Sequence, residues 1–145
     1  MRLSVDSSSF AKRYIQEKGS DELDVFLQQA SELALCVISL PELISGLNRR
    51  LQEGALSEKD YRETKKLLLD DVRDATVLQL TPAVISRSVK LLENNALRAM
   101  DALHIACALE WKADIFITSD RRQLDAAIKS GLRSEYLGQS GSRGF

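Results

Sequence analysis

Short continuous apolar runs alternate along the chain with stretches of helical periodicity. Apolar residues fill 33–38, which is typical of a strand buried on both faces, and Ile115 to Thr118 is a second compact strand; 76–80 also indicates a strand, whereas 3–5 is a weaker candidate. Strands that alternate with helices predict an α/β fold. We expect a three-layer sandwich, with a central, mostly parallel sheet flanked by helices.

Helix boundaries are marked by polar caps, prolines and glycines. Ser57 and Thr81-Pro82 are typical start signals, and Gly131 is a typical stop. These signals, with apolar residues recurring every three to four positions, predict helices that begin near residues 21, 39, 57, 82, 99 and 121. The helix after Thr81-Pro82 should present an apolar side made of Val84, Ile85, Val89, Leu91 and Leu92.

Length and composition fit one ordinary globular domain. The chain has 145 residues, of which 44% are hydrophobic and 28% charged, enough to fold without disulfides or a structural metal. No repeat or low-complexity block divides it. We therefore expect a single domain over 1–137, followed by a flexible tail over 138–145.

The charge balance excludes binding to nucleic acid through net charge alone. Twenty Lys and Arg stand against 21 Asp and Glu, a formal net charge of −1, so only a local basic rim could attract a phosphate backbone. Basic residues do occur in pairs, as in Arg49-Arg50 and Arg121-Arg122. Each pair is also explained by a solvated helix face.

Neither a signal peptide nor a stretch of ~20 apolar residues is found, which predicts a cytoplasmic protein without a membrane span. Cys36 and Cys107 lie in unrelated apolar contexts and are expected as small buried thiols. A single histidine, His104, and the lack of a Cys-x-x-Cys pattern disfavour zinc.

Four acidic residues are the candidate catalytic residues. Asp6 and Asp120 follow predicted strands, Glu42 lies shortly after the 33–38 run, and Asp101 lies among the apolar residues of MDALHIACAL. In open parallel sheets, chemistry takes place outside the carboxyl ends of the strands. Acids gathered there would repel one another unless a hard cation lay between them, and carboxylates without Cys or His suit Mg²⁺ or Mn²⁺.

Each acid also has a structural explanation. Asp6 and Asp120 could cap the helices that follow them, and Ser39-Leu40-Pro41-Glu42 has the form of a capping box. Asp101 could simply pair with Arg98 on a helix surface. His104 is better explained as a packed or hydrogen-bonded histidine than as a general base, and Asp125 as a solvated residue.

Three segments resemble PIN domains of the bacterial VapC toxin type. They are VDSSSFAKRYIQEKGSDEL, ISLPELISGL and ALRAMDALHIACALEWKADIFITSDRRQL, and the match runs in order over about residues 1 to 135. The resemblance implies a Mg²⁺-dependent ribonuclease with a catalytic set of Asp6, Glu42, Asp101 and Asp120. It makes Asp6 and Asp101 the expected metal ligands, with Ser7 and Thr118 as supporting hydroxyls. Arg98, Arg121 and Arg122 are expected near the RNA phosphates.

The same resemblance bears on partners. Toxins of this type are commonly dimers and are inhibited by an antitoxin, so we expect an RNA substrate, an antitoxin and a homodimer. Two other functions fit the sequence less well. A catalytically silent binding module should lack an acid, and none is missing; a phosphoacceptor receiver domain needs paired acids near its first strand, whereas VDSSS holds only Asp6.

Overall fold

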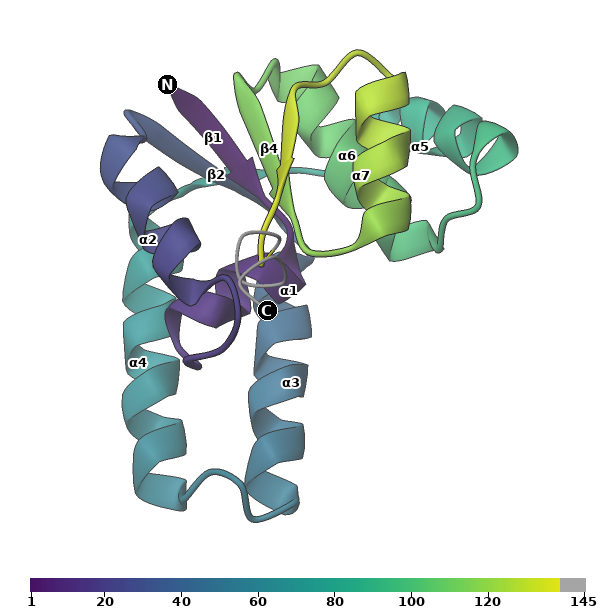
Figure 1. Ribbon diagram of the computed structural model, residues 1–145. Helices are drawn as coiled ribbons and strands as arrows, with labels where there is room; N and C mark the ends of the chain where they lie inside the picture. The colour runs from purple at the N-terminus through teal and green to yellow at the C-terminus, as the bar shows by residue number, and fades with distance from the viewer. Residues whose placement is uncertain (139–145) are drawn as a thin grey trace.

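Five short strands lie side by side at the centre of the computed structural model, which describes residues 1–138 (Figure 1). Their order is β3-β2-β1-β4-β5, and every neighbouring pair is parallel. Leu3 of β1 lies opposite Leu33 on one side and Ile115 on the other. The prediction of an α/β fold with a central parallel sheet is confirmed.

The elements along the chain alternate as the apolar pattern predicts. They are β1 (Arg2–Val5), α1 (Ser7–Phe10), the 3₁₀ helix η1 (Ala11–Arg13), α2 (Ser20–Gln29), β2 (Glu32–Cys36), α3 (Ser39–Gln52), α4 (Glu58–Asp74), β3 (Thr76–Leu78), α5 (Pro82–Asn94), α6 (Ala99–Trp111), β4 (Ile115–Thr118), α7 (Arg121–Lys129) and β5 (Ser134–Tyr136).

Helices cover both faces of the sheet, because side chains on successive strand residues point to opposite sides. Ile115 and Ile117 of β4 pack with residues of α1 to α4, whereas Phe116 packs with residues of α5, α6 and α7. Figure 1 shows these two helical layers, with α3 and α4 projecting from the body as a long antiparallel pair. The expected three-layer arrangement is therefore present.

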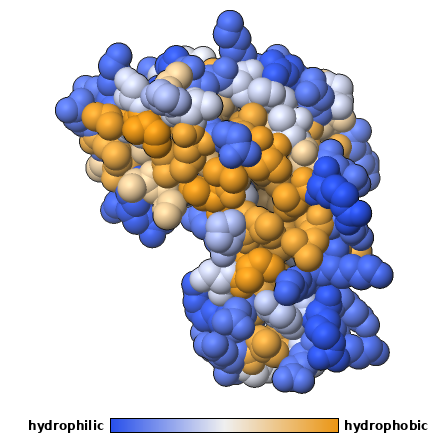
Figure 2. All heavy atoms as spheres, turned by 180° about the vertical axis from the view of Figure 1, so that it is seen from behind, coloured by the Kyte–Doolittle hydropathy of each residue, from blue (hydrophilic) through white to orange (hydrophobic). Residues whose placement is uncertain are grey.

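The apolar side of α5 is only partly covered. Val84 and Leu91 are buried, but Ile85, Val89 and Leu92 are more than one third exposed. These three residues lie on one stripe of the helix, since they are four and then three positions apart. Figure 2 shows hydrophobic side chains gathered over a broad area of the face turned away from the viewer in Figure 1.

The two cysteines are free and buried, as expected, with their Sγ atoms 3.5 Å apart. Of the tail predicted over 138–145, the part from residue 139 onward lies outside the described residues. Gly138 donates its backbone N–H to Glu22 Oε1 at 3.0 Å. Within residues 1–138, no helix is both long and apolar enough to cross a membrane.

Candidate active site

Asp6 lies at the carboxyl end of β1, where the chain turns directly into α1. It is the N-cap of α1, and its Oδ1 accepts a hydrogen bond from the Ser9 backbone N–H at 2.9 Å. Asp6 is buried, so desolvation raises its pKa above the usual range, against the opposing charge of His104 and the hydrogen bonds from Ser9 and Thr118. The predicted capping role is present, on a carboxylate kept from water.

Glu42 meets two other elements at the same edge of the sheet. Its Oε1 accepts a hydrogen bond from Ser7 Oγ of α1 at 2.6 Å and lies 2.8 Å from His104 Nε2 of α6. Ser7 Oγ and His104 Nε2 are themselves 3.1 Å apart. Three residues from distant parts of the chain thus form one cluster, which we call the Glu42 cluster.

The capping-box interpretation of Glu42 is wrong. The N-cap of α3 is Ile38, which makes no side-chain capping bond, and Ser39 is already the first residue of the helix. Glu42 therefore lies one turn inside α3 with its carboxylate turned to Ser7 and His104. The sequence spacing was right for a capping box, but the helix begins one residue too early for it.

Charge stabilises the Glu42 cluster. Burial alone would raise the pKa of Glu42, but the hydrogen bonds from His104 and Ser7 hold that pKa below its usual range. Burial would likewise lower the pKa of His104, but the bond to Glu42 and the charge of Asp6 raise it. His104 is thus a buried, hydrogen-bonded histidine, as expected, and it favours an ionised Glu42.

Asp101 lies in the first turn of α6, which begins at the same edge of the sheet. Its Oδ2 is 3.3 Å from Arg98 Nε, so the predicted ion pair with Arg98 is formed. The Arg98 side chain is 81% exposed, and such a pair contributes little stability in water. Because its loss would cost little, the pairing leaves Asp101 available for other ligands.

Gln123, which the sequence pattern did not single out, connects Asp120 and Thr118 to α6. Asp120 caps α7 by accepting from the backbone N–H groups of Arg122 and Gln123. Thr118 Oγ1 accepts from the Asp120 backbone N–H and donates to Gln123 Oε1 at 2.8 Å. Gln123 Nε2 in turn donates to the Asp101 carbonyl oxygen at 3.0 Å.

Gln123 is almost completely buried and so connects the end of β4 to the start of α6. A sequence signal for it did exist. Gln123 lies three and four residues before Ala126 and Ala127, on what the spacing shows to be the apolar face of α7. A polar side chain on such a face must find buried partners.

The three arginines expected near RNA differ in their surroundings. Arg98 pairs with Asp101, and the Arg121 guanidinium lies 4.1 Å from the ring centroid of Tyr136. Arg122 is exposed and lies in the first turn of α7. All three side chains are exposed. Arg98 contacts Asp101, and Arg121 and Arg122 directly follow Asp120 in the sequence.

The four candidate acids offer the oxygen donors that hard divalent cations prefer. Among residues 1–138, no three Asp, Glu, His or Cys side chains come together as a ready-made metal-binding group. Mg²⁺ keeps several waters and is usually held by one or two carboxylates. Asp6 and Asp101 fit this chemistry, because each contributes carboxylate oxygen at or next to the carboxyl edge of the sheet.

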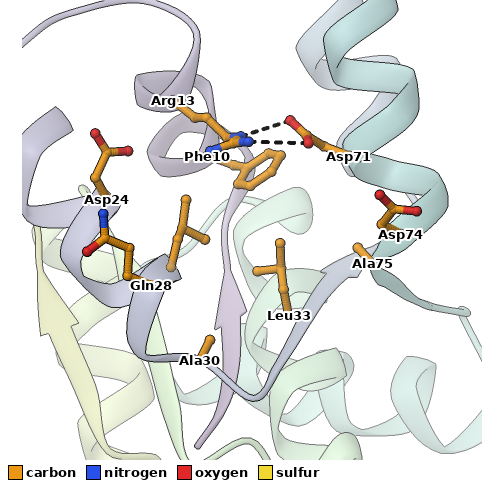
Figure 3. A pocket seen from close by; sticks show the side chains of 10 residues that line it. Phe10, Arg13, Asp24, Gln28, Ala30, Leu33, Asp71, Asp74 and Ala75 are labelled. Atoms are coloured by element: carbon orange, nitrogen blue, oxygen red, sulfur yellow. Dashed lines mark hydrogen bonds and ion pairs between the residues drawn. The ribbon is translucent and has the colours of Figure 1, made fainter.

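Two pockets lie on the side of the molecule that holds α1. One, of about 520 Å³, lies between η1, α2 and α4 and contains none of the four candidate acids (Figure 3). The other, of about 560 Å³, begins at Ser7 and Glu42 and follows α3. Of these two pockets, the second is the one that Ser7 and Glu42 of the Glu42 cluster line.

Comparison with known proteins identifies the family of this chain. The family model described as the PIN domain matches residues 4–129. The chain belongs to the PIN domain family. No curated protein matches it.

Solved structures with this PIN domain fold include several toxins. A toxin-antitoxin complex from Klebsiella pneumoniae has a TM-score of 0.66 at 15% identity, covering 84% of this chain and 89% of that one. FitAcB from Neisseria gonorrhoeae has a TM-score of 0.69 at 13% identity, covering 91% and 95%. VapC20 from Mycobacterium tuberculosis, described as a sarcin-ricin loop cleaving toxin, has a TM-score of 0.65 at 15% identity, covering 86% and 94%.

Proposed function

We propose that this PIN domain is a Mg²⁺-dependent endoribonuclease and the toxin of a toxin-antitoxin pair. The observation that carries the proposal is the Glu42 cluster at the carboxyl edge of the sheet, next to the buried carboxylate of Asp6. The Mycobacterium tuberculosis neighbour, described as a sarcin-ricin loop cleaving toxin, supports it. Mn²⁺ has the same ligand preferences and could replace Mg²⁺.

The proposed chemistry is hydrolysis of an RNA phosphodiester bond. A bound Mg²⁺ would supply a more acidic water and would neutralise charge on a phosphoryl oxygen. Asp6 and Asp101 are the residues that would hold it. Hydrogen bonds hold both residues in place. Asp6 accepts one from the Ser9 backbone N–H, and the Asp101 carbonyl oxygen accepts one from Gln123.

Glu42 and the arginines have other roles in this proposal. Glu42, kept ionised by Ser7 and His104, would orient the attacking water. Asp120 is held by Thr118 and the start of α7 and supports the same water or the metal. Arg98, Arg121 and Arg122 attract the phosphates of the RNA.

Total cellular RNA tests the activity. The purified protein is incubated with RNA in Mg²⁺ and in EDTA, beside the Asp101→Asn variant, with folding followed by circular dichroism. We expect discrete fragments only from wild type in Mg²⁺. A folded wild type that cuts nothing and binds no Mg²⁺ in calorimetry would instead support the alternative, a catalytically silent PIN-fold binding module.

An antitoxin and a second copy of the chain are the proposed protein partners. A structural neighbour from Klebsiella pneumoniae is a toxin-antitoxin complex, which supports the first. An antitoxin arginine could occupy the acidic edge, because a guanidinium binds carboxylates in bidentate fashion. If so, protein purified with such a partner should be inactive, and it should cut RNA after the partner is removed by unfolding and refolding.

A further inference from the structure

The pocket beside α3 is not explained by the proposed chemistry. Ser7 and Glu42 form its inner end, Arg49 and Arg50 lie along α3 toward its outer end, and it encloses about 560 Å³. Arg49 is seven residues beyond Glu42, roughly 10 Å along a helix. We call this space the α3 pocket.

Between its polar ends, the α3 pocket is lined by apolar side chains. Leu43 and Leu47, both buried, contribute from α3, and Ala11 and Ile15 contribute from the facing segment. Tyr14 adds an aromatic ring, which is also packed edge-on against Phe10. The pocket therefore combines apolar walls, one aromatic side chain and polar ends.

Gly46 holds the α3 pocket open. It lies in the interior of α3, where glycine weakens a helix relative to alanine, and its φ is not positive. A Cβ placed on Gly46 would meet no atom within 4 Å. Neither backbone conformation nor close packing requires glycine here, so the effect of the missing side chain is to widen the pocket that Gly46 lines.

Arg49 and Arg50 carry positive charges that form no ion pair within residues 1–138. Arg13, Arg87 and Arg98 all form ion pairs, whereas the guanidinium groups of Arg49 and Arg50 form neither ion pairs nor hydrogen bonds in the described part of the chain. Two acids do lie on the rim. Glu17 is paired with Lys12 at 3.0 Å, and Glu53 lies at the outer end, one turn beyond Arg49.

We propose that the α3 pocket is a subsite for an unpaired nucleotide of an RNA strand, next to the phosphate that is cut. The inference rests on the proposed ribonuclease function. The base lies against Leu43, Leu47 and the open space at Gly46, and the phosphate on its outer side lies beside Arg49 and Arg50. Bases have flat apolar faces that pack on apolar and aromatic side chains, and guanidinium groups bind phosphate in bidentate fashion.

A single strand fits this pocket better than a duplex does. The volume is in the range of small-molecule sites, so it admits one splayed base and excludes stacked base pairs. The pocket also opens onto Ser7 and Glu42, so a strand seated in it continues into the candidate active site. The guanidinium groups of Arg49 and Arg50 favour an RNA strand, which carries a phosphate on each nucleotide, over a peptide as the occupant.

Substitutions at Gly46 test the proposed subsite without lowering the stability of the fold. Gly46→Ala should stabilise α3 and narrow the pocket, and Gly46→Leu should fill it. Binding is measured by fluorescence anisotropy with a labelled, random-sequence ten-nucleotide single-stranded RNA in EDTA, so that cleavage does not interfere. We expect Gly46→Leu to weaken binding by about tenfold and Gly46→Ala to weaken it less, with melting temperatures no lower than that of wild type.

The charged end is tested in the same assay. The double variant Arg49→Gln, Arg50→Gln should weaken binding and reduce its dependence on salt, because two phosphate contacts are lost. The matched controls are Ser45→Leu, at an exposed position next to Gly46, and Lys65→Gln, Lys66→Gln on α4. Neither control should change binding by more than about twofold.

The outcomes separate the subsite from the enzyme. Wild type that binds this RNA no better than Gly46→Leu does, or that binds none, overturns the subsite, even if it cuts RNA in Mg²⁺. Wild type whose RNA binding depends on Gly46 but that cuts no RNA supports nucleotide binding in the α3 pocket and overturns the ribonuclease. If Gly46→Leu prevents binding of a protein inhibitor and leaves RNA binding unchanged, the occupant is a protein segment and the proposal is wrong.

Discussion

Asp6 is held in a position that suits a carboxylate poorly. It is buried, and desolvation raises its pKa, so its charge costs folding free energy. The helix cap does not need that charge, since asparagine caps a helix about as well as aspartate. A carboxylate kept where an amide would serve the fold supports a functional role for Asp6.

Asp6→Asn should therefore separate activity from stability. We expect the variant to lose RNA cleavage by at least a hundredfold, because it removes a proposed metal ligand, while its melting temperature stays equal to or above that of wild type. Cleavage of total RNA and a thermal melt followed by circular dichroism measure the two effects. Asp125→Asn, at an exposed position on α7, is the control and should change neither. Full activity in Asp6→Asn would remove Asp6 from the catalytic set.

The Glu42 cluster should make stability depend on pH in a defined direction. His104 has a pKa raised above 6.5, so its contribution is complete below pH 6.5 and is lost as the pH rises through the raised value. Glu42 has a pKa lowered below 4.5, so its contribution is present above pH 4.5 and is lost as the pH falls through the lowered value. The two contributions are both complete between these limits.

The measurement compares wild type with His104→Gln in EDTA. We expect the difference in melting temperature to be largest between about pH 5 and 6.5 and to shrink as the pH rises above 6.5. Glu42→Gln should reduce the same difference, because it removes the main partner of His104. A difference between wild type and His104→Gln that stays constant from pH 5.5 to 8.5 would show that His104 does not change protonation on folding.

For individual residues, the sequence indicated which ones belong to the candidate site better than it indicated which of them are in contact. It singled out Asp6, Glu42 and His104, but it could not show that Glu42 and His104 meet, because 62 residues separate them. It also left Gln123 unnoticed, since a glutamine in a charged helix start has many surface explanations. Long-range hydrogen bonds depend on how α3, α6 and α7 pack, which periodicity does not describe.

Elements were predictable where their apolar pattern was long or continuous. The 33–38 and 115–118 runs correspond to β2 and β4, which are buried at the centre of the sheet. The missed elements are short or polar. β5 is the tripeptide Ser134–Tyr136 at the edge of the sheet, and α1 and η1 are four and three residues long, too short to show a period.

One of these short elements is attached to the long helix α4. Arg13 Nε of η1 donates to Asp71 Oδ2 at 2.8 Å, and the Tyr14 hydroxyl donates to the same oxygen at 2.6 Å (Figure 3 shows Arg13 and Asp71). Burial would raise the pKa of Asp71, but the bonds from Arg13 and Tyr14 lower it. Asp71 therefore adds stability above pH 3.8 that is lost as the pH falls through its lowered pKa.

Asp71→Asn should lower the melting temperature by a few degrees at pH 7, and this loss should shrink below pH 4. The matched control is Asp70→Asn, the preceding residue of α4, whose carboxylate pairs only with the exposed Arg73 on its own helix in the described part of the chain. The control should have little effect at either pH. Equal losses in the two variants would mean that the link between η1 and α4 does not contribute.

For the whole molecule, the exposed stripe on α5 bears on the proposed homodimer. Ile85, Val89 and Leu92 are 43%, 47% and 37% exposed, although the apolar pattern placed all three on one side of the helix. The sequence predicted that side correctly, but it could not show that the neighbouring helices leave it uncovered. Contiguous apolar surface on a protein often marks an interface with a partner.

A dimer formed through this stripe would be especially sensitive to charge. In a two-fold symmetric interface each residue occurs twice, so Val89→Glu brings two carboxylates into an apolar contact. We expect wild type to have twice the mass of one 16.2 kDa chain in light scattering at micromolar concentration, and Val89→Glu to have the mass of one. Leu67→Glu is the control, because Leu67 is 59% exposed on α4, away from the stripe. A wild-type monomer, or dissociation caused equally by Leu67→Glu, would exclude α5 as the surface that pairs two chains.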